Sequence, residues 1–275
     1  MKTYKLSLHS HTTNFIHFIL TKPNKKKYLK KLLKILFIKK GNLVLGISNF
    51  NDDDRYKKLL ETAENLRNYK INAKYRDFFF SIEKNNKKVY FVKTDEIETN
   101  KGHILIIGFK GKIRKRRLEE VLKEAHKQGC VIIANHPLHH EFNITYFFIK
   151  KILNSNKEIS INKKELIKHK KDFDAIELDA YFPEDWIKIK KFATKNKIPI
   201  ISDSDAHFLD EIFASFYEVK NLNFINPALF KKSLKNALKK RIHLHAKKYG
   251  YFARYKHLLE VVLENFGKKI GLLKP

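Results

Sequence analysis

Residues 6 to 12 read LSLHSHT, an apolar, strand-like run that ends in two histidines. Alternate side chains of a β-strand face the same side, so His9 and His11 are expected to point together. Two imidazoles on one face of a strand end can bind a metal ion, although a single His-x-His taken alone is more often part of a surface strand. We therefore expect the functional site to be built around this strand end.

A second run, ISDSDAH at residues 201 to 207, closes in the same way near the other end of the chain. If strand geometry persists that far, Asp205 and His207 also share a face, and four ligand-type groups can converge. Further candidates of the same kind lie between the two runs, mostly where an apolar run stops: Glu96, His103, His136 and Glu177.

Length and composition predict one large α/β domain or two small ones, because 275 residues with 43% hydrophobic content can fill a substantial core. The one cysteine, Cys130, lies inside an apolar stretch, which predicts a buried, unreactive thiol and excludes a disulfide within the chain. The start of the chain leads into a strand pattern rather than a signal peptide, and no apolar run is long enough to span a bilayer. A cytoplasmic location is expected.

The charge balance is strongly basic, with 58 lysine and arginine residues against 29 aspartate and glutamate residues and a net charge of +29. Such a field attracts polyanions. The excess is almost all lysine and only 9 glycines are present, so a genome-wide codon bias is an alternative explanation. The densest basic runs, at residues 25–31, 110–117 and 231–248, are also compatible with solvated helix faces.

Strands and helices are predicted to alternate along the chain. Apolar runs typical of buried strands occur at residues 4–8, 43–48, 89–94, 103–108, 130–135, 174–179 and 198–202. Helix-like stretches occur at residues 25–40, 52–69, 115–128, 143–171 with a break at 154–160, and 184–196, and two basic helices follow at 227–241 and 252–267. Residues 73–94 predict a hairpin that includes Asn85 and Asn86 and whose second arm is the third strand.

This alternation predicts a mainly parallel sheet with right-handed crossovers, and seven strands indicate a barrel. Most candidate ligands fall at or just past the carboxyl end of an apolar run, where barrels of alternating strands and helices place their active sites. His103 instead begins its strand, and Glu96 follows an unusually polar strand end. The strand-end pattern therefore does not by itself predict these two residues as ligands.

Four motifs occur in order between about residues 4 and 210: His9-x-His11-Thr12, Glu96 before His103-Ile104-Leu105, His136-Pro137, and Ser204-Asp205-Ala206-His207. Together they resemble the PHP (polymerase and histidinol phosphatase) family of metal-dependent phosphoesterases. The resemblance implies an α/β fold, a distorted TIM-like (β/α)7 barrel of the PHP type over residues 1–220. Residues 221–275 would form a basic C-terminal helical extension packed on the same domain.

The family's second motif is eroded in this chain. Where the family usually carries threonine-aspartate-histidine-aspartate after strand two, this chain has Ser48-Asn49-Phe50-Asn51, so phenylalanine replaces a ligand histidine. The acidic residue expected shortly after the first motif is also missing, and His17 is the nearby group that could substitute.

The resemblance implies a pair of divalent ions, Zn, Mn or Fe, bridged by Glu96. The other ligands carried over by motif are His9, His11 and Asp205 for the first ion and His103 and His136 for the second. A third site would retain only His207, assisted by His17 or Asp52, so it is expected to be weak or absent.

Two adjacent cations can lower the pKa of a bridging water and neutralise phosphoryl oxygens, which makes hydrolysis of a phosphate ester feasible at neutral pH. His207 is then a ligand of a residual third ion or the general acid for the leaving oxygen, acting beside Asp205. Arg55, Lys22 or the loop after His136 could clamp the phosphate. The expected substrate is a nucleotide, an oligonucleotide end or a small phosphorylated metabolite.

A different class of function stays open, a non-catalytic nucleic-acid-binding protein of degenerate PHP fold. Its support is the eroded second motif and the basic segment 227–248, which has interleaved aromatic residues that could stack bases: Phe230, Tyr249, Tyr251 and Phe252. Retention of costly-to-bury ligand groups argues for a working metal site instead.

Several alternatives concern single residues. Glu98 could replace Glu96 as the bridge if the strand register shifts by two residues, and Glu177 is expected to hydrogen-bond near the site rather than to ligate. Asp203, His139 and His140 are weaker candidates. Ordinary solvated histidines are expected at His169, His243, His245 and His257.

Overall fold

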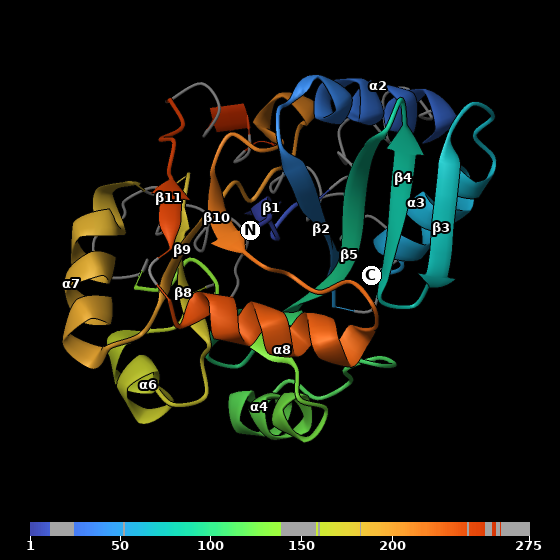
Figure 1. Ribbon diagram of the computed structural model, residues 1–275. Coiled ribbons are helices and arrows are strands. Elements are labelled where there is room, and N and C mark those ends of the chain that lie inside the picture. The colour runs from blue at the N-terminus through green and yellow to red at the C-terminus, as the bar shows by residue number, and fades with distance from the viewer. Residues whose placement is uncertain are drawn as a thin grey trace.

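The computed structural model describes residues 1–11, 25–51, 53–138, 158, 160–181, 183–240, 242–250, 255, 256 and 259. Within them, one sheet of eleven strands carries the fold (Figure 1). Its main path runs, in order of pairing, through β11 (His243–His245), β10 (Phe216–Lys220), β1 (Thr3–Ser7), β2 (Asn42–Phe50), β5 (Lys87–Thr99), β6 (Gly102–Ile107), β7 (Val131–Ala134), β8 (Ala175–Asp179) and β9 (Ile200–Asp203). Two further strands, β3 (Lys70–Tyr75) and β4 (Phe79–Lys84), extend from β5.

The sheet nearly closes into a barrel, because β9 returns to the side of β1. The carboxylate of Asp203 accepts hydrogen bonds from Oγ of Ser7 at 2.8 Å and from the backbone N–H of Leu8 at 2.7 Å. Just beyond the two strands, the backbone N–H of His11 donates to the carbonyl of Ala206 at 2.7 Å. The prediction of an α/β barrel is confirmed, and its closure brings the two histidine-bearing strand ends together.

Between β1 and β9 on the main path of the sheet, one strand runs against its neighbours. β1, β2, β5, β7, β8 and β9 are mutually parallel, whereas β6 is antiparallel to both β5 and β7. Only Asn100 and Lys101 separate β5 from β6, and so short a link can form a hairpin but not a crossover. The reversal places the first residues of β6 at the same barrel end as the carboxyl ends of its neighbours.

The helices lie around the sheet (Figure 1). The structure contains α2 (Lys25–Ile38), α3 (Arg55–Glu64), α4 (Leu118–Lys127), α6 (Lys163–Lys168), α7 (Trp186–Asn196) and α8 (Pro227–Leu238), with short 3₁₀ turns at η1 (Pro183–Asp185) and η2 (Leu209–Glu211). The predicted helix positions are confirmed for these segments. Of the predicted helix at 252–267 the structure describes residues 255, 256 and 259, which are helical, and the first part of the 143–171 stretch lies outside the described residues.

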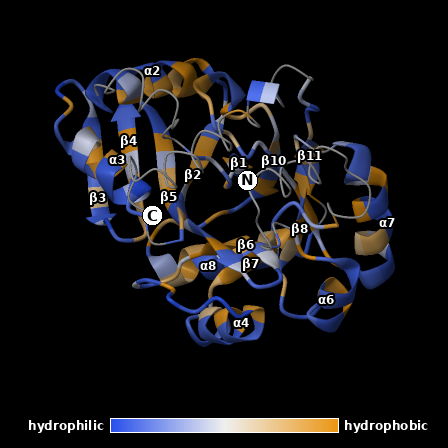
Figure 2. Cartoon of the chain, turned by 180° about the vertical axis from the view of Figure 1, so that it is seen from behind, coloured by the Kyte–Doolittle hydropathy of each residue, from blue (hydrophilic) through white to orange (hydrophobic). Residues whose placement is uncertain are grey.

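Each helix packs one apolar face on the barrel. In α4, the buried residues recur at the spacing of one helix face: Leu118, Val121, Leu122 and Ala125. Figure 2 shows the result, with hydrophilic and hydrophobic residues mixed along α2, α4 and α7. Cys130 is fully buried in the same core, as predicted.

The predicted hairpin forms at β4 and β5, which pair antiparallel. Asn85 and Asn86 connect them with positive φ angles of 49° and 59°, the combination that a tight two-residue turn requires. Three strands were missed by the sequence pattern: β3, β10 and β11. They lie at the margins of the sheet, where residues are only partly buried and a continuous apolar run is not needed.

Among the described residues, no helix combines the length and apolar character needed to cross a membrane.

Candidate metal centre

Two buried histidines follow β1. The exposed fraction is 0% for His9 and 4% for His11, and their Nε2 atoms lie 3.2 Å apart. The bonds of Leu8 and His11 to the β9 side of the barrel fix the backbone on which both imidazoles stand. The predicted common orientation of the two rings is therefore present.

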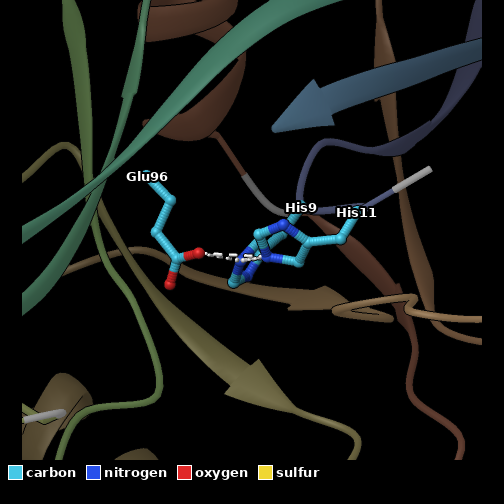
Figure 3. Close-up of side chains that lie close together, drawn as sticks. All are labelled: His9, His11 and Glu96. Atoms are coloured by element: carbon cyan, nitrogen blue, oxygen red, sulfur yellow. Dashed lines mark hydrogen bonds and ion pairs between the residues drawn. The ribbon is translucent and has the colours of Figure 1, made fainter. Parts of the chain in front are cut away.

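Glu96 in β5 lies at the centre of the site, 3% exposed. Its Oε2 atom is 3.0 Å from Nε2 of His11 and 3.5 Å from Nε2 of His9, and Figure 3 shows the carboxylate pointing at both rings. Its Oε1 atom is 3.0 Å from Nδ1 of His103 and 3.4 Å from Nε2 of His136. Each oxygen thus faces its own pair of imidazoles, and we call these five residues the Glu96-centred group.

The reversed direction of β6 explains the position of His103. This residue begins its strand, yet the antiparallel pairing sets it beside the carboxyl end of β5, opposite Glu98. His136 arrives from the end of β7 with a φ of 25°, a conformation that non-glycine residues rarely adopt. The backbone N–H of His136 donates to Oε2 of Glu177 at 3.2 Å, which helps to hold this turn.

Asp205 and His207 complete the set of predicted ligands. Oδ1 of Asp205 is 3.2 Å from Nε2 of His9, 3.4 Å from Nε2 of His11 and 3.5 Å from Nε2 of His207. This oxygen is buried and none of these contacts has hydrogen-bond geometry. We call Asp205 with His11 and His207 the Asp205-centred group.

A further carboxylate supports the site from behind. Glu177 is fully buried, and its Oε1 lies 3.0 Å from Nδ1 of His9. A neutral His9 that donates Nδ1–H to this carboxylate presents the lone pair of Nε2 to the centre, the arrangement that fixes metal-ligating histidines. The expectation that Glu177 hydrogen-bonds near the site is confirmed.

The second carboxylate that the sequence left open has a different role. Glu98 is bonded to Asn51, through its backbone N–H at 3.0 Å and its Oε2 at 3.4 Å. It belongs to none of the ligand groups among the described residues, whereas Glu96 belongs to two of them. The register of β5 therefore favours Glu96 as the shared carboxylate.

The charges of the centre shift each other's pKa values. Burial disfavours protonation of His9, but the nearby carboxylates, Asp205 first, raise its pKa well above the usual value. Burial also disfavours ionisation of Glu96, but the charge of His9 and bonds from the other imidazoles hold the pKa of Glu96 well below the usual value. The same opposition holds the pKa of Asp205 low, with His9 as the main charge.

The residues present fit divalent metal ions. Three groups have ligand atoms within 4.8 Å of one another: His9, His11 and Glu96; Glu96, His103 and His136; and His11, Asp205 and His207. Two imidazole Nε2 atoms facing each other, with a carboxylate oxygen that no hydrogen bond satisfies, are the contacts that a cation placed between them would stabilise.

The residues of the eroded motif after β2 pack and form hydrogen bonds instead of ligating a metal ion. Phe50 packs edge to face on the ring of His103, with 5.6 Å between ring centroids. The amide of Asn49 donates to Asp95 at 3.1 Å and accepts from the backbone N–H of Tyr56 at 2.9 Å. The substitutes suggested for the third site, His17 and Asp52, lie outside the described residues, as do Lys22, His139 and His140.

Three functional contacts were not predicted from the sequence. Arg55 NH1 lies 2.9 Å from Nδ1 of His11, and because a guanidinium can only donate, Nδ1 is the acceptor in this arrangement. The side-chain amide of Asn135 donates to Glu96 at 3.4 Å. Glu211 accepts the backbone N–H of His207 at 2.9 Å. Asn135 carried a signal because it directly precedes the histidine at the end of β7, and Arg55 had been named only as a candidate phosphate clamp.

Comparisons with known proteins show the fold alone. No family model matches the chain, and no curated protein matches its sequence. Among solved structures, PsfC from Pseudomonas syringae PB-5123 aligns with a TM-score of 0.61 at 13% identity, over 96% of this chain and 98% of that chain. The two molecules therefore share their overall fold from end to end.

Two other structures align more loosely. The lesion-specific endonuclease PfuEndoQ from Pyrococcus furiosus gives a TM-score of 0.42 at 18% identity, over 88% of this chain and 57% of that chain. A protein from Bifidobacterium adolescentis assigned as a metal-dependent phosphoesterase gives 0.41 at 10% identity, over 74% and 87%. We draw nothing about this chain from either of them, and membership of the PHP family stays a prediction.

Proposed function

We propose that this protein is a metal-dependent phosphoesterase that hydrolyses a phosphate ester of a nucleotide, an oligonucleotide end or a small metabolite. The observation that carries the proposal is the division of the Glu96 carboxylate, whose two oxygens each face a separate pair of imidazoles. A carboxylate in this position can be shared by two neighbouring ions, as two-metal hydrolases require.

The Glu96-centred group, completed by Asp205, would hold the two ions. When bound, such ions polarise the phosphoryl oxygens and make water a nucleophile at neutral pH. The chain's own residues orient the imidazoles, with Glu177 holding the ring of His9. Arg55, half-buried beside His11, provides a guanidinium within reach of a bound phosphate.

His207 is the proposed general acid. Its side chain is 18% exposed, more than that of any other member of the two groups, so it lies where a leaving group can reach solvent. Glu211 fixes its backbone, and Asp205 lies 3.5 Å from its Nε2. An imidazole pKa suits proton donation to a leaving oxygen near neutral pH.

The direct test is hydrolysis of aryl phosphate monoesters and diesters by protein supplied with Mn²⁺ or Zn²⁺. We expect turnover that a chelator abolishes and that His136→Ala lowers by about 10³-fold or more. His126→Ala, which changes a half-exposed histidine remote from the centre, is the matched control and should leave turnover unchanged. Metal-loaded protein that is inert on both ester classes would contradict the proposal.

The net charge of +29 supports a second candidate, a nucleic-acid-binding protein without catalysis. The structure weakens part of its basis, since Phe230 is fully buried and Tyr249 is 7% exposed, so neither offers a face for stacking bases. Tyr251 and Phe252 lie outside the described residues. Steeply salt-dependent binding of single-stranded oligonucleotides by protein that retains no metal would favour this candidate over hydrolysis.

A further inference from the structure

A second group of ligand-type side chains lies between α4 and α6, which are side by side in both views of the chain (Figures 1 and 2). It consists of Glu119 in the first turn of α4, Glu165 in α6 and His169, which caps the end of α6. It shares no residue with the centre around Glu96. The expectation that His169 is a solvated histidine is wrong, because the residue is only 9% exposed.

Two atoms of this group are buried and have no hydrogen-bond partner among the described residues. They are Oε2 of Glu165 and Nε2 of His169, 3.9 Å apart, on side chains that are 9% and 10% exposed. Oε1 of Glu119 lies at the same 3.9 Å from the imidazole nitrogen. Buried polar atoms without partners are costly, so a proton, a water or a cation is needed between them.

The other side of the His169 ring is arranged as in a metal-ligating histidine. Nδ1 lies 2.9 Å from Oδ2 of Asp172, so a neutral ring donates its proton there and keeps a lone pair on Nε2. A lone pair facing two carboxylates is repelled unless a proton or a cation lies among them. A carboxylate that orients an imidazole in this way is the usual support of a zinc-ligating histidine.

We propose that Glu119, Glu165 and His169 bind a divalent transition-metal ion, with Zn²⁺ as the best match, and that this ion ties α4 to α6. One imidazole and two carboxylates are a ligand set that zinc accepts, with water in the remaining position. Glu165 and His169 are four residues apart, so the turn of α6 brings both to the same face.

Lys168 is the competitor of this ion. Its Nζ lies 2.7 Å from Oε1 of Glu119 and 3.9 Å from Oε2 of Glu165, so the ammonium balances the same carboxylates. The bond from Lys168 lowers the pKa of Glu119 to about 2, which keeps this carboxylate ionised. The Lys168 side chain is 53% exposed and can turn outward into solvent when an ion enters.

The experiment counts zinc equivalents by equilibrium dialysis in the full-length chain. Because Glu96→Gln disables the main centre, one equivalent should remain in that variant and disappear when His169→Ala or Glu165→Gln is added. His126→Ala is the matched control, since its Nε2 bonds the other oxygen of Asp172 at 3.0 Å but lies outside the ligand group. Zinc binding should survive in Glu96→Gln/His126→Ala.

A variant that is expected to bind zinc more tightly provides a test that unfolding of the protein cannot mimic. Lys168→Met removes a competing unit charge about 4 Å from the ion and should tighten zinc binding by at least about tenfold at low salt. A zinc count that His169→Ala and Glu165→Gln leave unchanged, or an affinity that Lys168→Met leaves unchanged, would overturn the proposal and point to a water or a proton in the gap. Phosphoesterase assays on the wild-type protein test the function proposed for the Glu96-centred group independently of this zinc site.

Discussion

The Glu96-centred and Asp205-centred groups use the same residue types in different arrangements. Both oxygens of Glu96 are engaged, each with its own pair of imidazoles. In Asp205 a single oxygen faces three imidazoles, of which those of His9 and His11 are also turned toward Glu96. Of these three imidazoles, His207 alone is not also turned toward Glu96. The comparison teaches that the chain can complete a bridged pair of sites more readily than a third one.

The largest effect is expected from Glu96→Gln, which keeps the shape of the side chain and removes its charge. Phosphoesterase activity should fall by about 10³-fold or more, because both bridged sites lose their common ligand. Glu98→Gln, two residues along the same strand face and bonded to Asn51, should retain activity within about threefold. A reversed outcome, measured by kcat/KM and bound metal, would mean that the shared carboxylate is Glu98.

The next prediction tests whether the Asp205-centred group binds a metal ion independently of the Glu96-centred group. His207→Asn should lower kcat by about 10²-fold through loss of the general acid, with the two equivalents of metal at the Glu96-centred group retained. Metal analysis of the same preparation is the decisive measurement. Loss of one equivalent would show that the Asp205-centred group binds an ion of its own.

A smaller effect on metal affinity is expected from Glu177, which bonds the ring of the proposed ligand His9. In Glu177→Gln the ring of His9 loses its charged acceptor, so Nε2 becomes less basic and metal affinity should fall by roughly 10- to 100-fold. Competition with a chromophoric chelator measures this change. An unaltered dissociation constant would indicate that packing alone orients His9.

The last effect concerns chemical reactivity rather than catalysis, at a buried titratable group outside both groups. Burial raises the pKa of the Cys130 thiol to about 11. Compared with an ordinary cysteine, less than about 1% as much thiolate is then present at pH 8, so alkylation should be about 10²-fold slower in the folded than in the unfolded protein. Reaction rates with iodoacetamide, with and without denaturant, test this, and equal rates would show that the site is open to solvent.

Much of the fold was predictable because buried strands read as continuous apolar runs. β1, β2, β5, β7, β8 and β9 all coincide with such runs. β10 and β11 were missed, since a strand of five residues and one of three at the open edge of the sheet bury too little to leave that signature. The hairpin at Asn85 and Asn86 was predictable because its turn depends on local residue chemistry.

The sequence by itself determined which ligand-type residues stand at strand ends and which of them recur on one face, because burial and side-chain alternation are local properties. Only the tertiary structure decided that β6 is reversed, that Glu96 rather than Glu98 faces the imidazoles, and that His169 is buried beside two carboxylates. Strand direction, register and helix packing depend on contacts between segments far apart in the chain. No local pattern of residues encodes those contacts.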